Sequence, residues 1–125
     1  MSLRKVTTPA VPEPVGGIFT NCYVYGNQVF LAGQVSSGEG MEAQARGAFT
    51  KVQKLLEAAG GSLSDVVKMT VYVTDISKRP ELGKVRAEFF PGDKPCSTLV
   101  EVKGLAMPEY LVEIDATAIL GAGKK

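Results

Sequence analysis

Five stretches of the chain alternate apolar with polar residues or are rich in β-branched residues, and two longer stretches repeat apolar residues every three or four positions. A period of two is typical of a strand with one buried face, whereas the wider spacing is typical of an amphipathic helix. The pattern predicts strands at 21–25, 28–35, 66–74, 97–102 and 110–120, and helices at 41–59 and from near Pro80 to Pro91.

Turn and stop residues support these boundaries. Gly26-Asn27 separates the first two strands, and glycine at the first central position suits a two-residue type II′ hairpin. Gly60-Gly61 stops the first helix, and Pro91-Gly92 stops the second. Within the strand at 66–74, the alternation predicts one face made of Val67, Met69, Val71 and Val73.

The element order is therefore ββαβαββ, which predicts an α+β fold with a mixed sheet and two helices on one face. Two helices are too few to cover both faces of such a sheet, so the second face either meets water or is buried against copies of the same chain. The pattern favours an oligomer. One domain is expected over residues 1–125, with residues 1–15 and 121–125 as mobile ends.

Composition narrows the classes of partner. The chain has 14 basic and 13 acidic residues and a net charge of +1, so it lacks the broad positive field with which proteins attract nucleic acid or an anionic membrane. No apolar segment has the length of a signal peptide or of a membrane-spanning helix. We expect a soluble, cytoplasmic protein with neither a nucleic-acid nor a membrane partner.

Histidine is absent, and only two cysteines occur. Without histidine, a Ser-His-Asp triad, a Cys-His pair and a histidine-bound zinc are excluded. The cysteines, Cys22 and Cys96, form no redox or zinc motif, and we expect both to be reduced. Neither a metal nor a cofactor is expected, so any chemistry falls to carboxylates, hydroxyls, backbone groups, lysine or arginine.

Two groups of residues are candidates for a site. Glu113 and Asp115 share one face of a predicted strand, where they either hold a water or a cation, form a solvated row, or make a polar contact between subunits. Cys96, Ser97 and Thr98 open another strand, and alternation lets only one of Ser97 and Thr98 face a given cleft. With no base beside it, Ser97 is expected to bind a ligand rather than attack it, and Cys96 is expected to be a small buried residue.

The chain resembles the RidA (YjgF) family, also called the L-PSP endoribonuclease family, over roughly residues 17–120. The resemblance rests on the motifs LAGQV, AQARGAFTKVQKLLEAAGGSLSDVVKMTVYVTDI, AEFF, STLVEV and LVEIDATAI, in this order and spacing. It implies a chorismate-mutase-like fold and a homotrimer whose sheets pack around a central axis. Ligand clefts would then lie between neighbouring subunits.

The resemblance also implies chemistry. Well-studied members hydrolyse reactive enamine or imine intermediates to a 2-keto acid and ammonia, with an arginine that clamps the substrate carboxylate and a glutamate that holds the attacking water. Glu113 matches the glutamate, but Ser97 stands at the position of the arginine. A bidentate, charged contact from arginine binds a carboxylate more strongly than the single neutral hydrogen bond that serine can donate. No arginine follows Arg86 in the sequence. Either Lys94 or Lys103 replaces it, or the ligand is less anionic or held differently.

Other positions of the resemblance also depart from that subgroup. Phe19 matches a tyrosine near the first strand, and Ala32 matches a residue that is often serine. Gly33 and Gln34 are expected to end a strand where another backbone approaches closely, with their backbone groups facing the cleft. The predicted site thus has Glu113 as the catalytic residue and Ser97, Phe19, Gly33, Gln34, Ala32 and Thr98 as ligand-binding residues.

Three functions remain open. The first is a small-molecule hydrolase or deaminase that acts on enamine or imine metabolites through Glu113. The second is a non-catalytic trimer that binds a metabolite or a partner protein. The third, RNA cleavage, is implied by the family's alternative name alone, because the sequence offers neither a basic path nor a clear acid–base pair.

Overall fold

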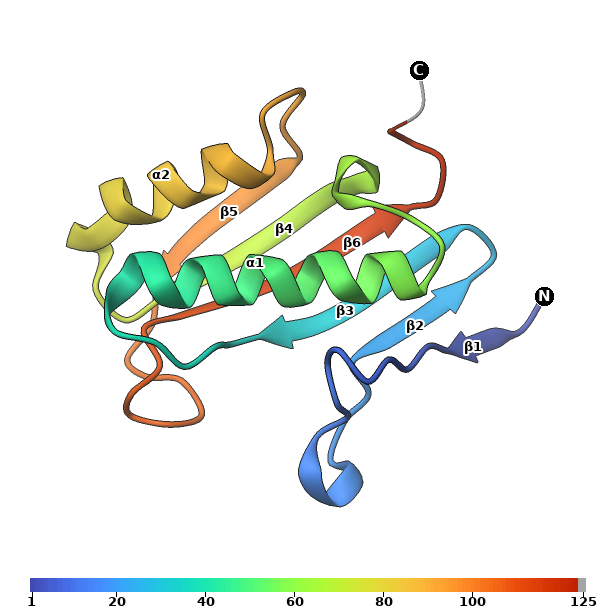
Figure 1. Cartoon of the computed structure of the whole chain (residues 1–125), viewed down its shortest axis with the longest axis horizontal. Helices are drawn as coiled ribbons and strands as arrows, with labels where there is room; N and C mark the ends of the chain where they lie inside the picture. Colours follow the sequence, from blue (N-terminus) through green and yellow to red (C-terminus); the bar gives the residue numbers. More distant parts are fainter. Residues whose placement is uncertain (124–125) are drawn as a thin grey trace.

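Six strands form one mixed sheet, and two helices lie across one of its faces (Figure 1). The structure is a computed structural model that describes residues 1–123. The strands are β1 (Leu3–Lys5), β2 (Cys22–Tyr25), β3 (Gln28–Gln34), β4 (Val66–Val73), β5 (Cys96–Glu101) and β6 (Val112–Ile119). The helices are α1 (Gly40–Ala58) and α2 (Arg79–Phe89), with short 3₁₀ turns η1 (Val15–Gly17), η2 (Leu63–Asp65) and η3 (Ile76–Lys78).

The strands lie in the order β1-β2-β3-β6-β4-β5. Neighbours are antiparallel except β4 and β5, which are parallel and are connected through α2. The five predicted strands and both predicted helices are present within two residues of their expected ends, so the α+β class is confirmed. Gly26 has a φ of 61° in the β2–β3 turn, as the predicted hairpin requires.

The core lies between the sheet and the helices. On α1 the buried side chains follow the predicted helical spacing and include Met41, Ala45, Phe49, Val52 and Leu56. On β6 every second residue, from Val112 to Ala118, is buried against them. The ring of Phe49 stacks on Phe89 at 5.3 Å and meets Phe90 edge-on at 5.8 Å, which joins α1 to the end of α2.

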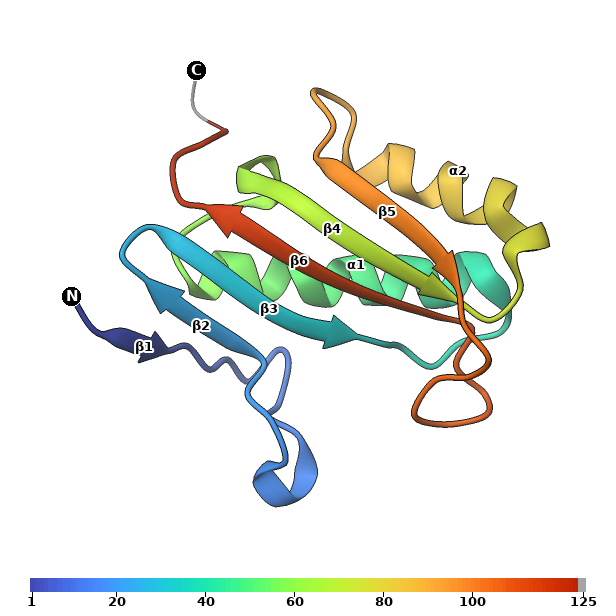
Figure 2. The ribbon, with the colours of Figure 1, turned by 180° about the vertical axis from the view of Figure 1, so that it is seen from behind.

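The other face of the sheet carries no helix (Figure 2). Tyr25 and Phe30 on this bare face are 45% and 42% exposed, and Tyr23, Thr70 and Tyr72 are half-buried. At the outer edge, β5 is exposed at every residue except Leu99. Cover of this face by other copies of the chain remains a prediction. None of the helices within residues 1–123 is both long and apolar enough to cross a membrane.

Two local features differ from the sequence prediction. Residues 3–5 form β1, which pairs with residues 23–25, and Val6 and Val11 are buried in the core. On β4, Val66 is buried and Val67 is only half-buried, because the β4–β6 register shifts between Val66 and Lys68. The mobility of residues 1–15 and 121–125 stays a prediction, and residues 124–125 lie outside the described part.

Candidate functional site

Glu113 is the second residue of β6 and stands on the bare face opposite Tyr72 of β4. Its carboxylate lies directly over Gly33 of β3: a Cβ atom added there would lie 2.3 Å from Glu113 Oε2. The β3–β6 register shifts between Leu31 and Gln34, so the backbone of β3 is irregular beneath the carboxylate. Gly33 therefore leaves room for this position of the Glu113 side chain, which would have to move if Gly33 carried a Cβ atom.

The surroundings of Glu113 leave its carboxylate uncommitted. Within residues 1–123 no hydrogen bond or ion pair engages it, although the side chain is half-buried. Burial raises the pKa of Glu113, and the negative charge of Asp115 raises it further. A carboxylate of this kind is suited to hold a water and to accept a proton from it.

Asp115, two residues along the same face, is engaged by the protein itself. Its Oδ1 accepts a hydrogen bond from the backbone N–H of Thr70 at 3.2 Å, and its Oδ2 accepts one from the Tyr72 hydroxyl at 3.0 Å. The hydrogen bond to Asp115 is the main cause of the raised pKa of Tyr72. Asp115 therefore stabilises the sheet, and Glu113 alone of the pair is free to act on a ligand.

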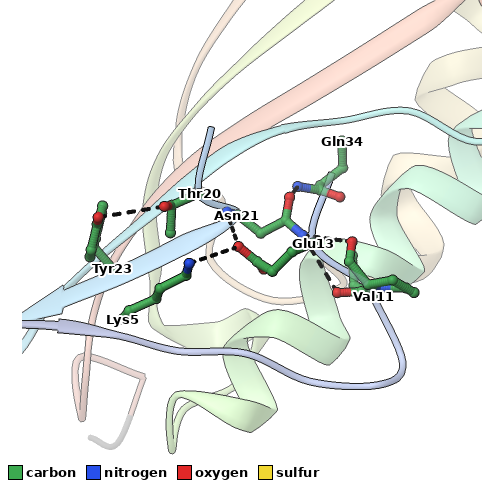
Figure 3. A network of polar contacts seen from close by, with 8 residues as sticks. Lys5, Val11, Glu13, Thr20, Asn21, Tyr23 and Gln34 are labelled. Carbon is green, nitrogen blue, oxygen red and sulfur yellow. Dashed lines mark hydrogen bonds and ion pairs between the residues drawn. The ribbon is translucent and has the colours of Figure 1, made fainter. Parts of the chain in front are cut away.

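Gln34 belongs to a buried polar network at the end of β3 (Figure 3). Its side-chain amide donates to Asn21 Oδ1 at 3.3 Å and to the Ala32 carbonyl at 3.1 Å. The Asn21 amide donates in turn to the carbonyls of Val11 and Pro12. The side chain of Gln34 thus fastens the N-terminal segment to the sheet.

The remaining N-terminal candidates lie near this network. Phe19 is 47% exposed on the loop between η1 and β2, two residues before Asn21. Ala32 is half-buried, and its N–H donates to the Asn21 carbonyl at 2.9 Å. The network therefore places the Phe19 loop beside the end of β3 that carries Gly33.

The residues that open β5 lie on two different faces. Ser97 pairs with Met69, whose side chain is buried under the helices, and so it faces α2. Thr98 pairs with Thr70 and faces the bare side with Asp115. Cys96 is exposed, which corrects the prediction of a buried residue: β5 is an edge strand, and nothing within residues 1–123 covers its start.

Ser97 and Glu113 do not meet within one chain. They lie on opposite faces of the sheet, on strands separated by β4. Glu113 is level with Val100 through Tyr72, three residues from Ser97, so about 10 Å along the strands and about 10 Å across them separate the two backbones. The single chain therefore keeps the two predicted half-sites, Ser97 and Glu113, apart.

Arg86, which sequence reasoning passed over, contacts Ser97. Its Nη1 donates to Ser97 Oγ at 3.3 Å from helix α2. Lys94 is instead bonded to the Phe90 carbonyl, and Lys103 is exposed beyond β5. A signal was present in the sequence, because Arg86 falls on the apolar stripe of α2, four residues after Leu82 and three before Phe89.

Two hollows lie on the surface. One, of about 540 Å³, lies between the α2–β5 loop at 90–95 and the segment 122–123, and Cys96 lines it. The other, of about 250 Å³, lies on the bare face beside Phe30, Thr70 and Asp115. Glu113 lines neither of these two hollows.

Comparisons with known proteins give a consistent assignment. The sequence model of the family described as Endoribonuclease L-PSP matches residues 11–120. The chain is 36% identical to a RutC family protein of Pyrococcus horikoshii, over 90% of this chain and 94% of that protein. It is 29% identical to a 2-iminobutanoate/2-iminopropanoate deaminase of Dermatophagoides farinae, over 94% and 96% of the two chains.

A solved structure agrees. The crystal structure of a YjgF/YER057c/UK114 family member from Mycobacterium tuberculosis superposes with a TM-score of 0.88 and 36% identity, covering 95% of this chain and all of that one. The family model spans most of the sequence, and both sequence and fold agree with it. The chain therefore belongs to the RidA/YjgF family, described as Endoribonuclease L-PSP.

Proposed function

We propose that the protein is a small-molecule hydrolase or deaminase that acts on enamine- or imine-type metabolites in clefts between the subunits of a homotrimer. The observation that carries this proposal is the half-buried Glu113 carboxylate over Gly33, which has no hydrogen-bond partner within residues 1–123 and a raised pKa. The name of the Dermatophagoides farinae relative supports the choice of reaction.

In the proposed reaction, Glu113 holds a water beside the imine carbon and accepts a proton as the water oxygen bonds to that carbon. The C=N bond becomes a single bond, and the nitrogen takes up the proton. Glu113 then moves the hydroxyl proton of the resulting carbinolamine to its nitrogen, and the C–N bond breaks as the oxygen forms the C=O bond. One imine and one water thus give one ketone and one ammonia. The raised pKa of Glu113 makes its carboxylate a stronger base than an exposed glutamate.

A trimer supplies the missing walls of the cleft. Ser97 faces the helices at the free edge of β5, whereas Glu113 stands on the bare face near the start of β6. Sheets that pack around an axis bury their bare faces and bring the edge of one chain beside the face of the next. In such an assembly the two half-sites come from neighbouring chains.

The test is ammonia release from a freshly generated 2-imino acid, measured against its spontaneous hydrolysis. Glu113→Gln keeps the shape of the side chain and removes the base, so the catalysed rate should fall by about 100-fold or more. Glu109→Gln removes an exposed carboxylate from the loop before β6 and should leave the rate unchanged. The proposal fails if the wild-type protein does not accelerate hydrolysis, or if Glu113→Gln retains full activity.

A non-catalytic, ligand-binding trimer is the second candidate. It is favoured by Ser97, which stands where the deaminase subgroup has its clamping arginine. Such a protein would be stabilised against heat by a metabolite while leaving the rate of imine hydrolysis unchanged. A thermal-shift screen with neutral and anionic metabolites, run beside the ammonia assay, separates the two functions.

A further inference from the structure

Arg86 lies in the last turn of α2, and its side chain extends to the start of β5. Its Nη1 donates to Ser97 Oγ at 3.3 Å. Its Nε is buried and has no hydrogen-bond partner within residues 1–123. The guanidinium is therefore held at the sheet edge by a single neutral contact.

The charge of Arg86 is not balanced by the described part of the chain. The adjacent acid on α2, Glu88, pairs with Arg46 of α1 at 2.6 Å, and none of the ion pairs within residues 1–123 involves Arg86. Burial lowers the pKa of Arg86, yet a guanidinium keeps its charge at neutral pH. A half-buried cation without a counter-charge is unfavourable, so an anion beside it would be bound strongly.

The position of the guanidinium is fixed and accessible. Leu82 and Val85 are buried beside it on α2, and the stacking of Phe89 on Phe49 holds the end of this helix against α1. Ser97 is exposed at the free edge of β5, and Arg86 Nη1 lies 3.3 Å from its hydroxyl oxygen, so an anion that contacts the serine hydroxyl lies beside the guanidinium. A preformed donor pair of this kind loses little entropy on binding.

We propose that Arg86, with Ser97 beside it, forms a carboxylate-binding subsite for the small-molecule ligand. The planar guanidinium matches the two oxygens of a carboxylate, and the serine hydroxyl adds one further donor. Arg86 of helix α2 thus brings a positive charge to the position on β5 that is occupied by Ser97. The reacting carbon then lies toward Glu113 of a neighbouring chain, a placement that rests on the proposed function.

The test is a calorimetric titration of the whole protein, once with 2-oxobutanoate and once with its neutral amide. The wild-type protein should bind the acid at least tenfold more tightly than the amide. Arg86→Gln should weaken binding of the acid by about ten- to a hundredfold and leave binding of the amide nearly unchanged. Arg86→Lys keeps the charge without the planar fork and should recover only part of the loss.

Matched variants separate this subsite from a general effect of charge. Arg79→Gln removes an exposed arginine from the first turn of the same helix and should bind the acid like the wild type. Ser97→Arg placed in the Arg86→Gln background should restore binding, because it returns a guanidinium to the same edge. The subsite is refuted if the wild type does not prefer the acid, or if Arg86→Gln binds it normally.

Two further outcomes keep this inference apart from the proposed function. Glu113→Gln should lose turnover and still bind 2-oxobutanoate, so binding without any wild-type turnover would sink the deaminase and leave the subsite standing. Full turnover of 2-imino acids by Arg86→Gln would refute the subsite and leave the proposed deaminase standing. A lower sedimentation mass of Arg86→Gln would assign the guanidinium to an acidic group of a neighbouring chain, and that result would also overturn the subsite.

Discussion

Glu113 and Asp115 lie two residues apart on the same face of β6, yet their surroundings differ. Asp115 accepts hydrogen bonds from Thr70 and Tyr72, so its carboxylate is engaged by the protein. Glu113 is half-buried beside the like charge of Asp115, and no hydrogen-bond donor within residues 1–123 contacts its carboxylate. The folded chain therefore disfavours the ionised form of Glu113.

This difference predicts how Glu113 alters stability with pH. The pKa of Glu113 is raised above its ordinary value of 4.5, so the folded chain favours the protonated form. The contribution of this group to stability is complete below an unfolded-state pKa of about 4.5 and is lost as pH rises through the folded-state pKa. Glu113→Gln should therefore melt near the wild-type temperature at about pH 4 and above it at about pH 8.

Thermal melts of the wild type, Glu113→Gln and Glu109→Gln across this range provide the measurement. Glu109 is exposed, and its substitution should give no comparable divergence between the two ends of the range. If the difference in melting temperature between Glu113→Gln and the wild type does not change with pH, the fold does not disfavour the ionised form of Glu113, and the prediction is wrong.

The contact between β3 and β6 depends on the absence of a side chain at Gly33. Gly33→Ala would place a methyl group 2.3 Å from Glu113 Oε2 and 2.7 Å from its carboxyl carbon, so the glutamate must move. We expect a loss of about 1–3 kcal/mol in the free energy of unfolding. Imine hydrolysis should also fall, because the carboxylate is displaced from the strand that positions it.

Urea denaturation measures the cost of Gly33→Ala, and a second substitution assigns it. In a Glu113→Ala background the methyl group has room, so most of the penalty should disappear. Gly83→Ala on α2 is the matched control: nothing lies within 4 Å of the added methyl group, and a helical alanine should stabilise by about 0.5–1 kcal/mol. An equal penalty for Gly33→Ala in both backgrounds would show that the clash lies elsewhere.

Sequence periodicity found α1 and β6, which each bury one face, and missed β1, which buries none. β6 and α1 repeat their apolar residues over two or more turns or pleats, and their ends were predicted within two residues. β1 consists of three exposed residues, Leu3–Lys5, whose position comes from pairing with β2. The register shift between β4 and β6 at Val66 also depends on the partner strand, so the local sequence pattern does not predict it.

The candidate site was less predictable because its parts depend on the whole sheet. The pattern placed Glu113 and Asp115 on one face of a strand and Ser97 at the start of another strand, both correctly. That the two lie on opposite faces follows from the parallel register of β5 on β4, and the sequence alone does not set this register. Arg86 was missed for a related reason, since its contact with Ser97 joins a helix to the strand that follows it.

The proposed function requires an assembly, because Ser97 and Glu113 lie apart within one chain. A bare face with exposed Tyr25 and Phe30, together with an exposed edge at β5, leaves apolar area and unpaired backbone groups open to association. We expect sedimentation equilibrium to give a mass of about three times the 13.2 kDa of one chain. Phe30→Glu should lower this mass by placing a charge within the contact, whereas Phe30→Tyr should preserve it.

Mixing two inactive variants tests whether neighbouring chains share each site. Glu113→Gln retains Arg86, and Arg86→Gln retains Glu113, so a mixed trimer contains contacts between chains in which both intact residues meet. Random mixing should restore activity to about a quarter of the sites, because each of the two positions is intact in half of the chains. If both residues served a site within one chain, the mixture would be no more active than its components. Recovery of activity only after the subunits exchange would therefore show both that the oligomer forms and that its contacts hold the site.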